Sequence, residues 1–352
     1  MTTSFFERSI FHEFPHPENW REVVDELYSR FGSEGEGIPL SMCPCGNRKA
    51  TARRFLVARK YKVDEAEKML RDTLHWRQTV SVGDVVGVDS ILKAKPRWDL
   101  LSDSRKIIPS TPFHCYSKQG FPVYVLRLGK GDGSLAASTA EECHVYSSII
   151  RGEHLTRSII PDAHKRGLLQ NLTKGSSAGV TTPKLERLSH EDLDSETTID
   201  ITDNMEILDK QVVLVDLDGV GMSALRCLYV FKTINSVAAY NYPELSKAIY
   251  VLNTPSVFDY IWAAIKPILA PHTQSKIKIF QAGSDQYSAL QQIIEDDDIP
   301  DFLTPQVPGD PLRGKAGCVT GSELPSFRPS GVVSLDTWIE SQSDDPDKSC
   351  PF

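Results

Sequence analysis

The chain of 352 residues is long enough for one large domain or two unequal ones, which excludes a mini-protein held together by disulfides. Its 39 basic and 47 acidic residues give a net charge of −8, and 40% of the residues are hydrophobic. This composition indicates a globular, mildly acidic protein and argues against both disorder and general nucleic-acid binding.

The cysteines and the apolar segments indicate the compartment. Seven scattered cysteines, of which only Cys43 and Cys45 are close in sequence, predict reduced thiols and no zinc site. Residues 1–20 lack the charged and then apolar pattern of a secretory signal, and no stretch of eighteen apolar residues is uninterrupted. We therefore expect a cytoplasmic protein without a membrane-spanning helix, a metal or a cofactor.

The first hundred residues have helical patterns. A lead-in segment, residues 1–48, is rich in turn-forming residues and contains one predicted helix from Pro17 to Arg30. A helical piece follows at residues 49–95, in which Asp64 and Glu67 have the spacing of a capping box. Apolar residues then recur every three or four positions, which predicts an amphipathic helix.

Strand and helix patterns alternate in the next region, residues 96–310. The predicted strands are Gly120–Leu128, Gln211–Leu217, Ala248–Asn253 and Lys276–Phe280, and the predicted helices are Glu141–Ile150, Ser223–Tyr240 and Ser256–Leu269. The strand from Gln211 is a continuous apolar run, which is typical of a strand buried on both faces of a parallel sheet. We predict an α/β fold with a mostly parallel sheet and flanking helices behind a small all-helical piece.

Two segments do not fit this alternation. The first, at about residues 165–209, has eight acidic residues and no Lys or Arg between Glu191 and Asp209, which predicts an inserted, mobile acidic loop. A solvated surface excursion and a regulatory segment both remain open interpretations of it. The tail, residues 311–352, is rich in Pro, Gly and Ser, and we expect it to be mostly irregular.

The end of one predicted strand resembles the first motif of haloacid-dehalogenase-like phosphohydrolases. In that reading Asp216 is the nucleophile and Asp218 is the general acid. Such an enzyme also needs paired acidic residues at a later strand end to hold magnesium, and residues 281–285 provide one at most. The phosphohydrolase remains an alternative from a different functional class.

A longer set of motifs resembles the CRAL-TRIO lipid-binding family, which includes the fungal phosphatidylinositol/phosphatidylcholine transfer proteins. In chain order these motifs are Arg54-Phe-Leu-Val-Ala-Arg-Lys-Tyr61, Gly120-Phe-Pro-Val-Tyr124, Asp216-Leu-Asp-Gly219, Asn241-Tyr-Pro-Glu244, Tyr250-Val-Leu-Asn-Thr-Pro255 and Thr273-Gln-Ser-Lys-Ile277. They cover roughly residues 50–305 in the family's order and spacing. The third motif also accounts for the phosphohydrolase-like pattern.

The resemblance implies a non-enzymatic protein that extracts phosphatidylinositol from membranes and transfers it. It implies an apolar cavity for the acyl chains, closed by a gate helix with an apolar stripe of Val257, Phe258, Ile261, Trp262 and Ile265. The headgroup residues that it implies are Arg59, Pro122, Glu244, Thr273 and Lys276. Among these, Lys276 and Thr273 would contact the phosphate and Glu244 would recognise the inositol hydroxyls, while Pro122 and Arg59 would supply shape and charge support.

Other ligands stay open within the same family. Gln211 and Val213 stand where the resemblance implies a Ser-x-Thr pair for phosphatidylcholine, which argues against choline lipids and leaves the second ligand undefined. A carrier or sensor of a sterol or a tocopherol-like ligand is an alternative. The expected partners are phosphatidylinositol or another phospholipid and, transiently, a membrane surface, with a lipid kinase as a candidate partner. We expect a monomer that does not bind nucleic acid.

Overall fold

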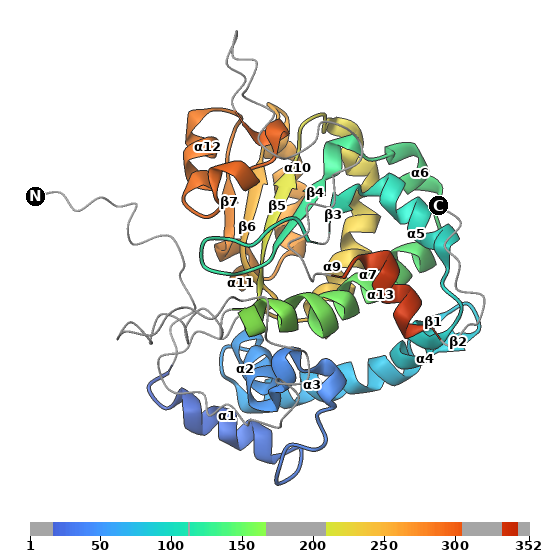
Figure 1. The fold of residues 1–352 in the computed structure, drawn as a ribbon, viewed down its shortest axis with the longest axis vertical. Coiled ribbons are helices and arrows are strands. Elements are labelled where there is room, and N and C mark those ends of the chain that lie inside the picture. The colour runs from blue at the N-terminus through green and yellow to red at the C-terminus, as the bar shows by residue number, and fades with distance from the viewer. Residues whose placement is uncertain (1–16, 112, 167–208, 305–332, 344–352) are drawn as a thin grey trace, which may run out of the picture.

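The computed structural model describes residues 17–111, 113–166, 209–304 and 333–343. In this part of the chain, the N-terminal helices lie beneath a twisted sheet that has helices on both faces (Figure 1). Nearly all of the predicted acidic insertion and most of the predicted irregular tail lie outside the described residues.

The N-terminal helices form a compact unit with its own core. They are α1 (Trp20–Ser29), α2 (Arg48–Ala58) and α3 (Val63–Thr79), with the short 3-10 turns η1 (Leu40–Met42) and η2 (Pro44–Gly46) between α1 and α2. Their shared core contains Val24, Leu27, Phe31, Ile38, Phe55, Leu56, Met69 and Leu70. The Asn47 side chain caps α2 by accepting a hydrogen bond from the N–H of Ala50. The predicted helix at Pro17–Arg30 is confirmed.

The predicted capping box at the start of α3 is wrong. The N-cap residue is Lys62, and no side chain caps this helix. Asp64 and Glu67 instead accept hydrogen bonds from the guanidinium of Arg30, each at 2.7 Å. The two carboxylates therefore tie α3 to the end of α1, a contact between residues 34 and 37 positions apart that local spacing does not reveal.

Several short elements connect this unit to the sheet. The strands β1 (Ser81–Val82) and β2 (Val85–Val86) form a hairpin. The helices are α4 (Val88–Lys93), α5 (Trp98–Ile107), α6 (Gly133–Ser138) and α7 (Glu141–His154). The remaining elements are the 3-10 turn η3 (Leu128–Lys130) and the π-helical turn η4 (Leu155–Ile159). The predicted helix from Glu141 is confirmed and is one turn longer than expected. Near the C-terminus, α13 (Leu335–Gln342) buries Trp338 and Ile339 in the core formed by α4, α5 and α7.

The central sheet has five strands in the order β3-β4-β5-β6-β7. Their bounds are β3 (Ser110–Thr111), β4 (Val123–Arg127), β5 (Gln211–Asp216), β6 (Ser246–Leu252) and β7 (Ile277–Ile279). The short edge strand β3 pairs antiparallel, and the other three pairings are parallel. The predicted mostly parallel α/β fold is therefore confirmed, with the continuous apolar strand β5 at its centre.

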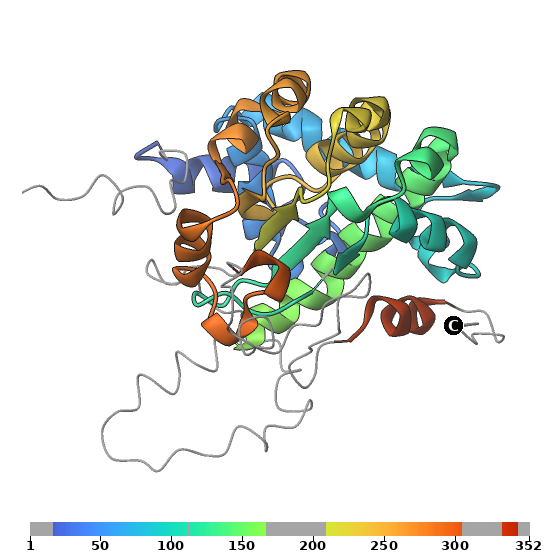
Figure 2. The same cartoon turned by 90° about the horizontal axis from the view of Figure 1, so that it is seen from above.

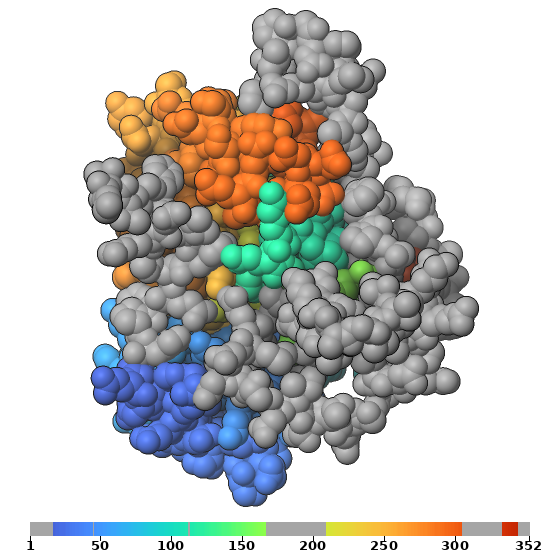
Figure 3. Space-filling model, turned by 60° about the vertical axis from the view of Figure 1, so that its left-hand side comes forward, coloured from blue at the N-terminus to red at the C-terminus, as the bar shows by residue number. Residues whose placement is uncertain are grey.

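One face of the sheet, which we call the closed face, is fully packed. Its apolar side chains are at most 3% exposed and are Val123, Val125, Val212, Leu214, Ala248, Tyr250 and Leu252. Lys278 of β7 shares this face and is half-buried. The apolar side chains pack against α12 (Ser284–Gln291) and the segment after it, which includes the 3-10 turns η9 (Asp296–Asp298) and η10 (Asp301–Leu303). Figure 3 shows this segment against the loop that leads into β4, where the N–H of Lys118 donates to the Ile293 carbonyl at 2.8 Å.

The opposite face, which we call the gate face, is more open. Because side chains alternate along a strand, it carries Tyr124, Leu126, Val213, Val215, Ile249, Val251, Ile277 and Ile279. Val213 and Val251 are 7% and 8% exposed, whereas the others on this face are half-buried or, like Ile279 at 40%, exposed. The turn η7 (Met222–Cys227), α9 (Leu228–Asn241) and α10 (Phe258–Ile265) lie on this side of the sheet (Figure 2).

Candidate functional site

A buried ion pair joins two of the predicted headgroup residues. Lys276 follows the short helix α11 (Pro271–Ser275), and its ammonium donates a hydrogen bond to the carboxylate of Glu244, which lies two residues before β6. The two side chains are 11% and 10% exposed. Charges removed from water to this extent are stable only when paired, and each of these two groups supplies the counter-charge of the other.

The backbone at Glu244 is unusual. Its φ angle is 61°, in the left-handed region that residues other than glycine rarely adopt. The next residue continues directly into the sheet, since the Leu245 carbonyl accepts the N–H of Gln211 at 2.8 Å. A strained residue of this kind persists only where its surroundings hold it, and such residues concentrate at functional sites.

A buried network holds the segment just before Glu244. The hydroxyl of Tyr242 donates to the Glu153 carboxylate at 2.7 Å. Arg77 of α3 donates to both oxygens of the same carboxylate, at 2.6 and 3.0 Å, and Arg157 of η4 donates to it at 2.6 Å. Because the Glu153 side chain has no exposed surface, this network fixes the N-terminal helices and the approach to β6 relative to one another.

The other predicted headgroup residues gather around this pair to different degrees. Thr273 shares the last turn of α11 with Lys276, whose N–H it accepts at 3.1 Å through its carbonyl. Pro122 immediately precedes β4 and is buried. Since β4 to β7 are parallel, Pro122, Glu244 and Lys276 all lie at the edge formed by the amino ends of the strands. Arg59 stands apart at the end of α2, where its guanidinium donates to the Ala58 carbonyl at 3.3 Å.

The sequence did not single out His272, which belongs to the same cluster. Its Nε2 lies 3.5 Å from the Glu244 carboxylate, and its side chain is 10% exposed. His272 and Lys276 are four positions apart across one helical turn, a spacing that places two side chains on the same helix face. The spacing of four between His272 and Lys276 was therefore the sequence signal that could have identified His272.

The predicted gate helix is shorter than expected. Instead of one helix over 256–269, α10 ends at Ile265 and is followed by the 3-10 turn η8 (Lys266–Ile268). Pro267 has no N–H to donate and interrupts the regular helix. Four of the five predicted stripe residues lie in α10, and Val257 is its N-cap residue.

The inner side of α10 packs on the gate face. Phe258 and Trp262 stack with ring centroids 6.0 Å apart and contact Val251 and Ile277 of the sheet. Ile261 is also buried, at 4% exposure, whereas Tyr260 on the outer side is 69% exposed. Within the described ranges, none of the helices combines the length and the apolar character that crossing a bilayer requires.

The two aspartates of the alternative hydrolase reading lie at the opposite edge of the sheet. Asp216 ends β5, is 1% exposed, and accepts hydrogen bonds from Arg127 at 3.2 Å and from Asn253 at 2.9 Å. The Asp216 Oδ1 atom that accepts from Asn253 also accepts the N–H of Asp218. The carboxylate of Asp218 itself pairs with Lys130. A nucleophilic carboxylate needs an oxygen free to attack, so these contacts favour a structural role. In the part of the chain described, no three His, Cys, Asp or Glu side chains are grouped as a metal site.

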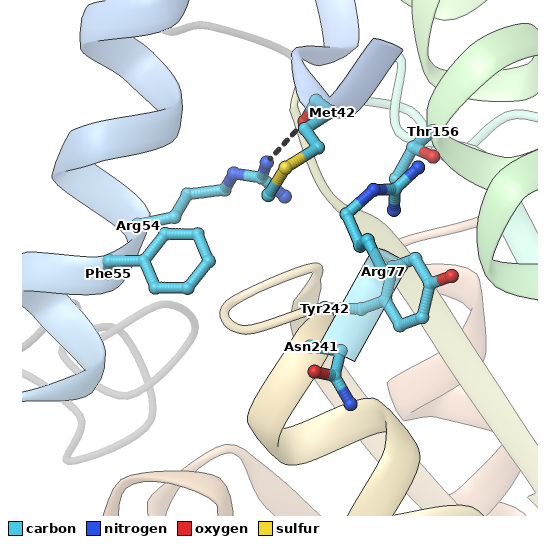
Figure 4. Close-up of a pocket in the computed structure, with 7 residues that line it drawn as sticks. All are labelled: Met42, Arg54, Phe55, Arg77, Thr156, Asn241 and Tyr242. Atoms are coloured by element: carbon cyan, nitrogen blue, oxygen red, sulfur yellow. Dashed lines mark hydrogen bonds between the residues drawn. The ribbon is translucent and has the colours of Figure 1, made fainter. Parts of the chain in front are cut away.

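A small pocket lies where the N-terminal helices meet the segment before Glu244 (Figure 4). It is lined by Met42, Arg54, Phe55, Arg77, Thr156, Asn241 and Tyr242. The Arg54 guanidinium points towards Met42 and donates to its carbonyl at 3.3 Å, while Arg77 pairs with Glu153. Since both cations are engaged with protein groups, the pocket is best understood as part of the joint between the two parts of the molecule.

Comparisons with known proteins agree with this architecture. Residues 185–304 match the family model of the CRAL/TRIO domain. "Protein real-time" of Drosophila pseudoobscura pseudoobscura is 26% identical over 266 residues, which cover 72% of this chain and 31% of that protein. "Phosphatidylinositol/phosphatidylcholine transfer protein SFH12" of Arabidopsis thaliana is 25% identical over 261 residues, which cover 71% and 38% of the two chains.

The "CRAL-TRIO domain-containing protein T23G5.2" of Caenorhabditis elegans is 28% identical over 256 residues, which cover 71% of this chain and 29% of that protein. The chain thus spans about a third of the length of these relatives. Among solved structures, the crystal structure of Sfh5 aligns with 16% identity and a TM-score of 0.47, covering 78% of this chain and 84% of that one. The family model and the relatives support the resemblance of this chain to the CRAL-TRIO lipid-binding family.

Proposed function

We propose that this chain binds phosphatidylinositol and transfers it between membranes, with its headgroup at Glu244, Lys276 and Thr273. The observation that carries the proposal is the buried Glu244–Lys276 pair beside an apolar sheet face that its helices leave partly open. In the bound state, Lys276 would turn to the phosphate and Glu244 would accept hydrogen bonds from inositol hydroxyls. Pro122 and Arg59 would shape the site and support its charge.

The gate face would hold the acyl chains. Each methylene group returned to water costs roughly 0.8 kcal/mol, so a lipid outside the membrane requires an enclosed apolar surface. The half-buried side chains of the gate face and the inner side of α10 supply such a surface. We propose that α10 acts as the gate, moving away from the sheet at a membrane surface and covering the lipid in water.

The proposal distinguishes this protein from carriers of purely apolar ligands. A sterol or a tocopherol-like molecule has neither a phosphate nor a polyol to replace the contacts that Glu244 and Lys276 make with each other. Opening that pair for such a ligand would leave two charges without partners, at a cost of a few kcal/mol. One SFH relative is named a phosphatidylinositol/phosphatidylcholine transfer protein, which supports the phospholipid assignment. We propose a non-enzymatic, monomeric carrier that acts in the cytoplasm and docks on membranes transiently.

Transfer of labelled lipid between vesicles tests the proposal. Donor vesicles contain labelled phosphatidylinositol or labelled phosphatidylcholine, and the lipid that reaches acceptor vesicles is measured. We expect transfer of phosphatidylinositol that falls at least tenfold in Lys276→Ala. Lys68→Ala is the matched control, because Lys68 also pairs with a carboxylate but is 76% exposed. Equal transfer by the wild type and Lys276→Ala would contradict the site, and absence of transfer by the wild type would contradict the function.

A further inference from the structure

Two basic side chains from α11 and its C-cap reach the same carboxylate oxygen. The ammonium of Lys276 donates to Oε2 of Glu244, and Nε2 of His272 lies 3.5 Å from that atom. All three side chains are about nine-tenths buried. In Figure 1, α11 lies at the lower end of β6 and β7, where the segment that carries Glu244 enters the sheet. The carboxylate therefore has a second nitrogen within reach if the first one leaves.

The backbone keeps Glu244 in place. Its φ angle of 61° is enforced from both sides, because Tyr242 is held by the buried network before it and Leu245 is hydrogen-bonded into the sheet after it. Lys276, in contrast, ends in a flexible four-carbon stem. A phosphate that enters the site would therefore draw the ammonium away and leave the carboxylate where it is.

The turn that carries the imidazole is also held. The side-chain amide of Gln274 donates to the carbonyls of Leu269 and Lys266 at 2.9 and 3.0 Å. The hydroxyl of Ser275 donates to the carbonyl of His272 at 2.7 Å. These bonds tie α11 to the chain before it, so the imidazole remains beside the carboxylate when the ammonium turns away.

The charges of this cluster balance in the free protein but not with a phospholipid bound. Lys276 and Glu244 cancel each other, so a neutral His272 leaves the free cluster without net charge. A phosphodiester adds one negative charge, and a protonated His272 would restore the balance. Because a buried site penalises uncompensated charge, binding of the phosphodiester and protonation of the imidazole favour one another.

Other basic groups near this edge of the sheet have partners elsewhere. Lys247 of β6 and Lys278 of β7 lie over aromatic rings, each 5.3 Å from the ring centre. Arg59 donates to a carbonyl of α2. Among the described residues, the charged groups that face the His272 imidazole are Glu244, from the segment before β6, and Lys276, from the end of its own helix.

We propose that His272 is a positioning residue for phosphatidylinositol binding, which takes up a proton from solvent as the lipid enters and replaces Lys276 as the partner of Glu244. Lys276 is thereby released to the phosphate, while the imidazolium keeps the carboxylate oriented towards the inositol hydroxyls. An imidazole changes its charge between about pH 5 and 8, so the affinity for phosphatidylinositol rises as the pH falls through this range. The inference rests on the proposed lipid-binding function and adds a proton that is bound together with the lipid.

The pH dependence of lipid loading tests this role. The full chain is incubated with increasing amounts of vesicles made of phosphatidylinositol and phosphatidylcholine, whose headgroups do not titrate between about pH 6 and 8.5, and is then re-isolated. Mass spectrometry of the bound phosphatidylinositol gives an apparent dissociation constant at each pH. We expect the wild type to bind at least about threefold more tightly at the acidic end of this range than at the alkaline end.

Two substitutions separate positioning from folding. His272→Gln keeps a neutral donor, so it should match the wild type within about twofold at the alkaline end and show no dependence on pH. His272→Leu also loses the donor and should bind at least about tenfold more weakly than the wild type at the acidic end, again without pH dependence. His75→Gln is the matched control, because His75 is an exposed histidine of α3, and it should keep the wild-type profile.

The outcomes distinguish this inference from the proposed function. A wild type that loads no phosphatidylinositol at any pH overturns the proposed function. A wild type that loads it with an affinity that is constant or falls on acidification overturns the role of His272. The same is true if His272→Gln keeps the wild-type profile, or if it lowers the affinity by the same factor at every pH, as loss of a purely structural contact would.

Discussion

Lys276 and Glu244 lie 32 residues apart in sequence and form an ion pair with both side chains about nine-tenths buried. The pair joins the end of α11 to the approach to β6, at the amino edge of the parallel strands. Polar groups at such a depth are either structural or held ready for a ligand. The variants below separate these two roles.

Removing one member of the pair should destabilise the fold, whereas removing both should not. Lys276→Met or Glu244→Gln alone leaves a buried polar group without its partner, and we expect a loss of about 3 kcal/mol in the free energy of unfolding. The double variant should recover most of that loss, because it leaves no unpaired charge, and should still fail to transfer phosphatidylinositol. Urea denaturation measures the first quantity and vesicle transfer the second. A double variant that recovers both stability and transfer would contradict the headgroup role.

The position of Tyr242 depends on a glycine opposite its ring. A Cβ atom added at Gly152 would lie 2.8 Å from Cζ of Tyr242, too close for a real contact. Gly152→Ala should therefore displace the ring from Glu153, lower the free energy of unfolding by about 1–3 kcal/mol and weaken phosphatidylinositol loading. Gly133→Ala is the matched control, because the atom nearest to its added Cβ is 3.9 Å away. Equal effects of the two alanines would argue against this packing constraint.

Asp301 should make stability depend on pH. It is 6% exposed, and neither carboxyl oxygen meets the full geometry of a hydrogen bond with a described group, although the Phe302 N–H lies close to the carboxylate. Burial raises its pKa, opposed by the Phe302 N–H and the charge of Arg127. A native pKa above the unfolded value favours the fold while the group is protonated, and that advantage disappears as the pH rises through the native pKa.

The corresponding variant is Asp301→Asn, which stays neutral at every pH. We expect it to match the wild type at about pH 4, near the unfolded pKa of an aspartate, and to exceed the wild type in stability at about pH 7. Denaturant midpoints measured over this range check the difference. A difference that does not vary with pH, or a variant that is less stable at neutral pH, would contradict the assignment.

The two sides of α10 should respond differently to substitution. Ile261 of α10 is 4% exposed, so Ile261→Ala should lower the free energy of unfolding by about 2–4 kcal/mol. Tyr260 is 69% exposed, and Tyr260→Ser should leave stability within about 0.5 kcal/mol while it weakens binding to lipid vesicles several-fold. Thermal unfolding and vesicle co-sedimentation provide the two readouts. Unchanged vesicle binding in Tyr260→Ser would mean that the outer side of α10 does not meet the membrane.

The strands were predictable because their pattern is local. The apolar run from Gln211 indicates burial on both faces, and β5 is indeed central, with β4 and β6 as its neighbours. The gate helix was predicted too long, because the apolar residues Ile268 and Leu269 follow Pro267 although the regular helix ends before it. The capping box failed for another reason, since Asp64 and Glu67 have a better partner in Arg30, which their spacing does not reveal.

The sequence likewise predicted some residues of the candidate site and missed others. Glu244 and Lys276 were found through motifs, and their contact follows from the parallel strands that bring both to one edge. His272 was missed because its distance to Glu244 depends on how α11 is placed beside β6. The hydrogen bond from Tyr242 to Glu153 joins residues 89 positions apart, and the hydrogen bond from Arg151 to Tyr124 joins residues 27 positions apart. No local pattern predicts such pairings.

Mass spectrometry of the lipid retained after incubation with mixed vesicles tests the central claim most directly. The wild type and Lys276→Ala are exposed to equal amounts of phosphatidylinositol, phosphatidylcholine and a sterol, re-isolated, and extracted. The proposed headgroup site predicts that the wild type retains phosphatidylinositol above the other two and that Lys276→Ala loses at least nine-tenths of it while remaining folded, a tenfold loss that corresponds to about 1.4 kcal/mol. Retention of the sterol in preference to phosphatidylinositol, or equal retention of phosphatidylinositol by both proteins, would contradict it.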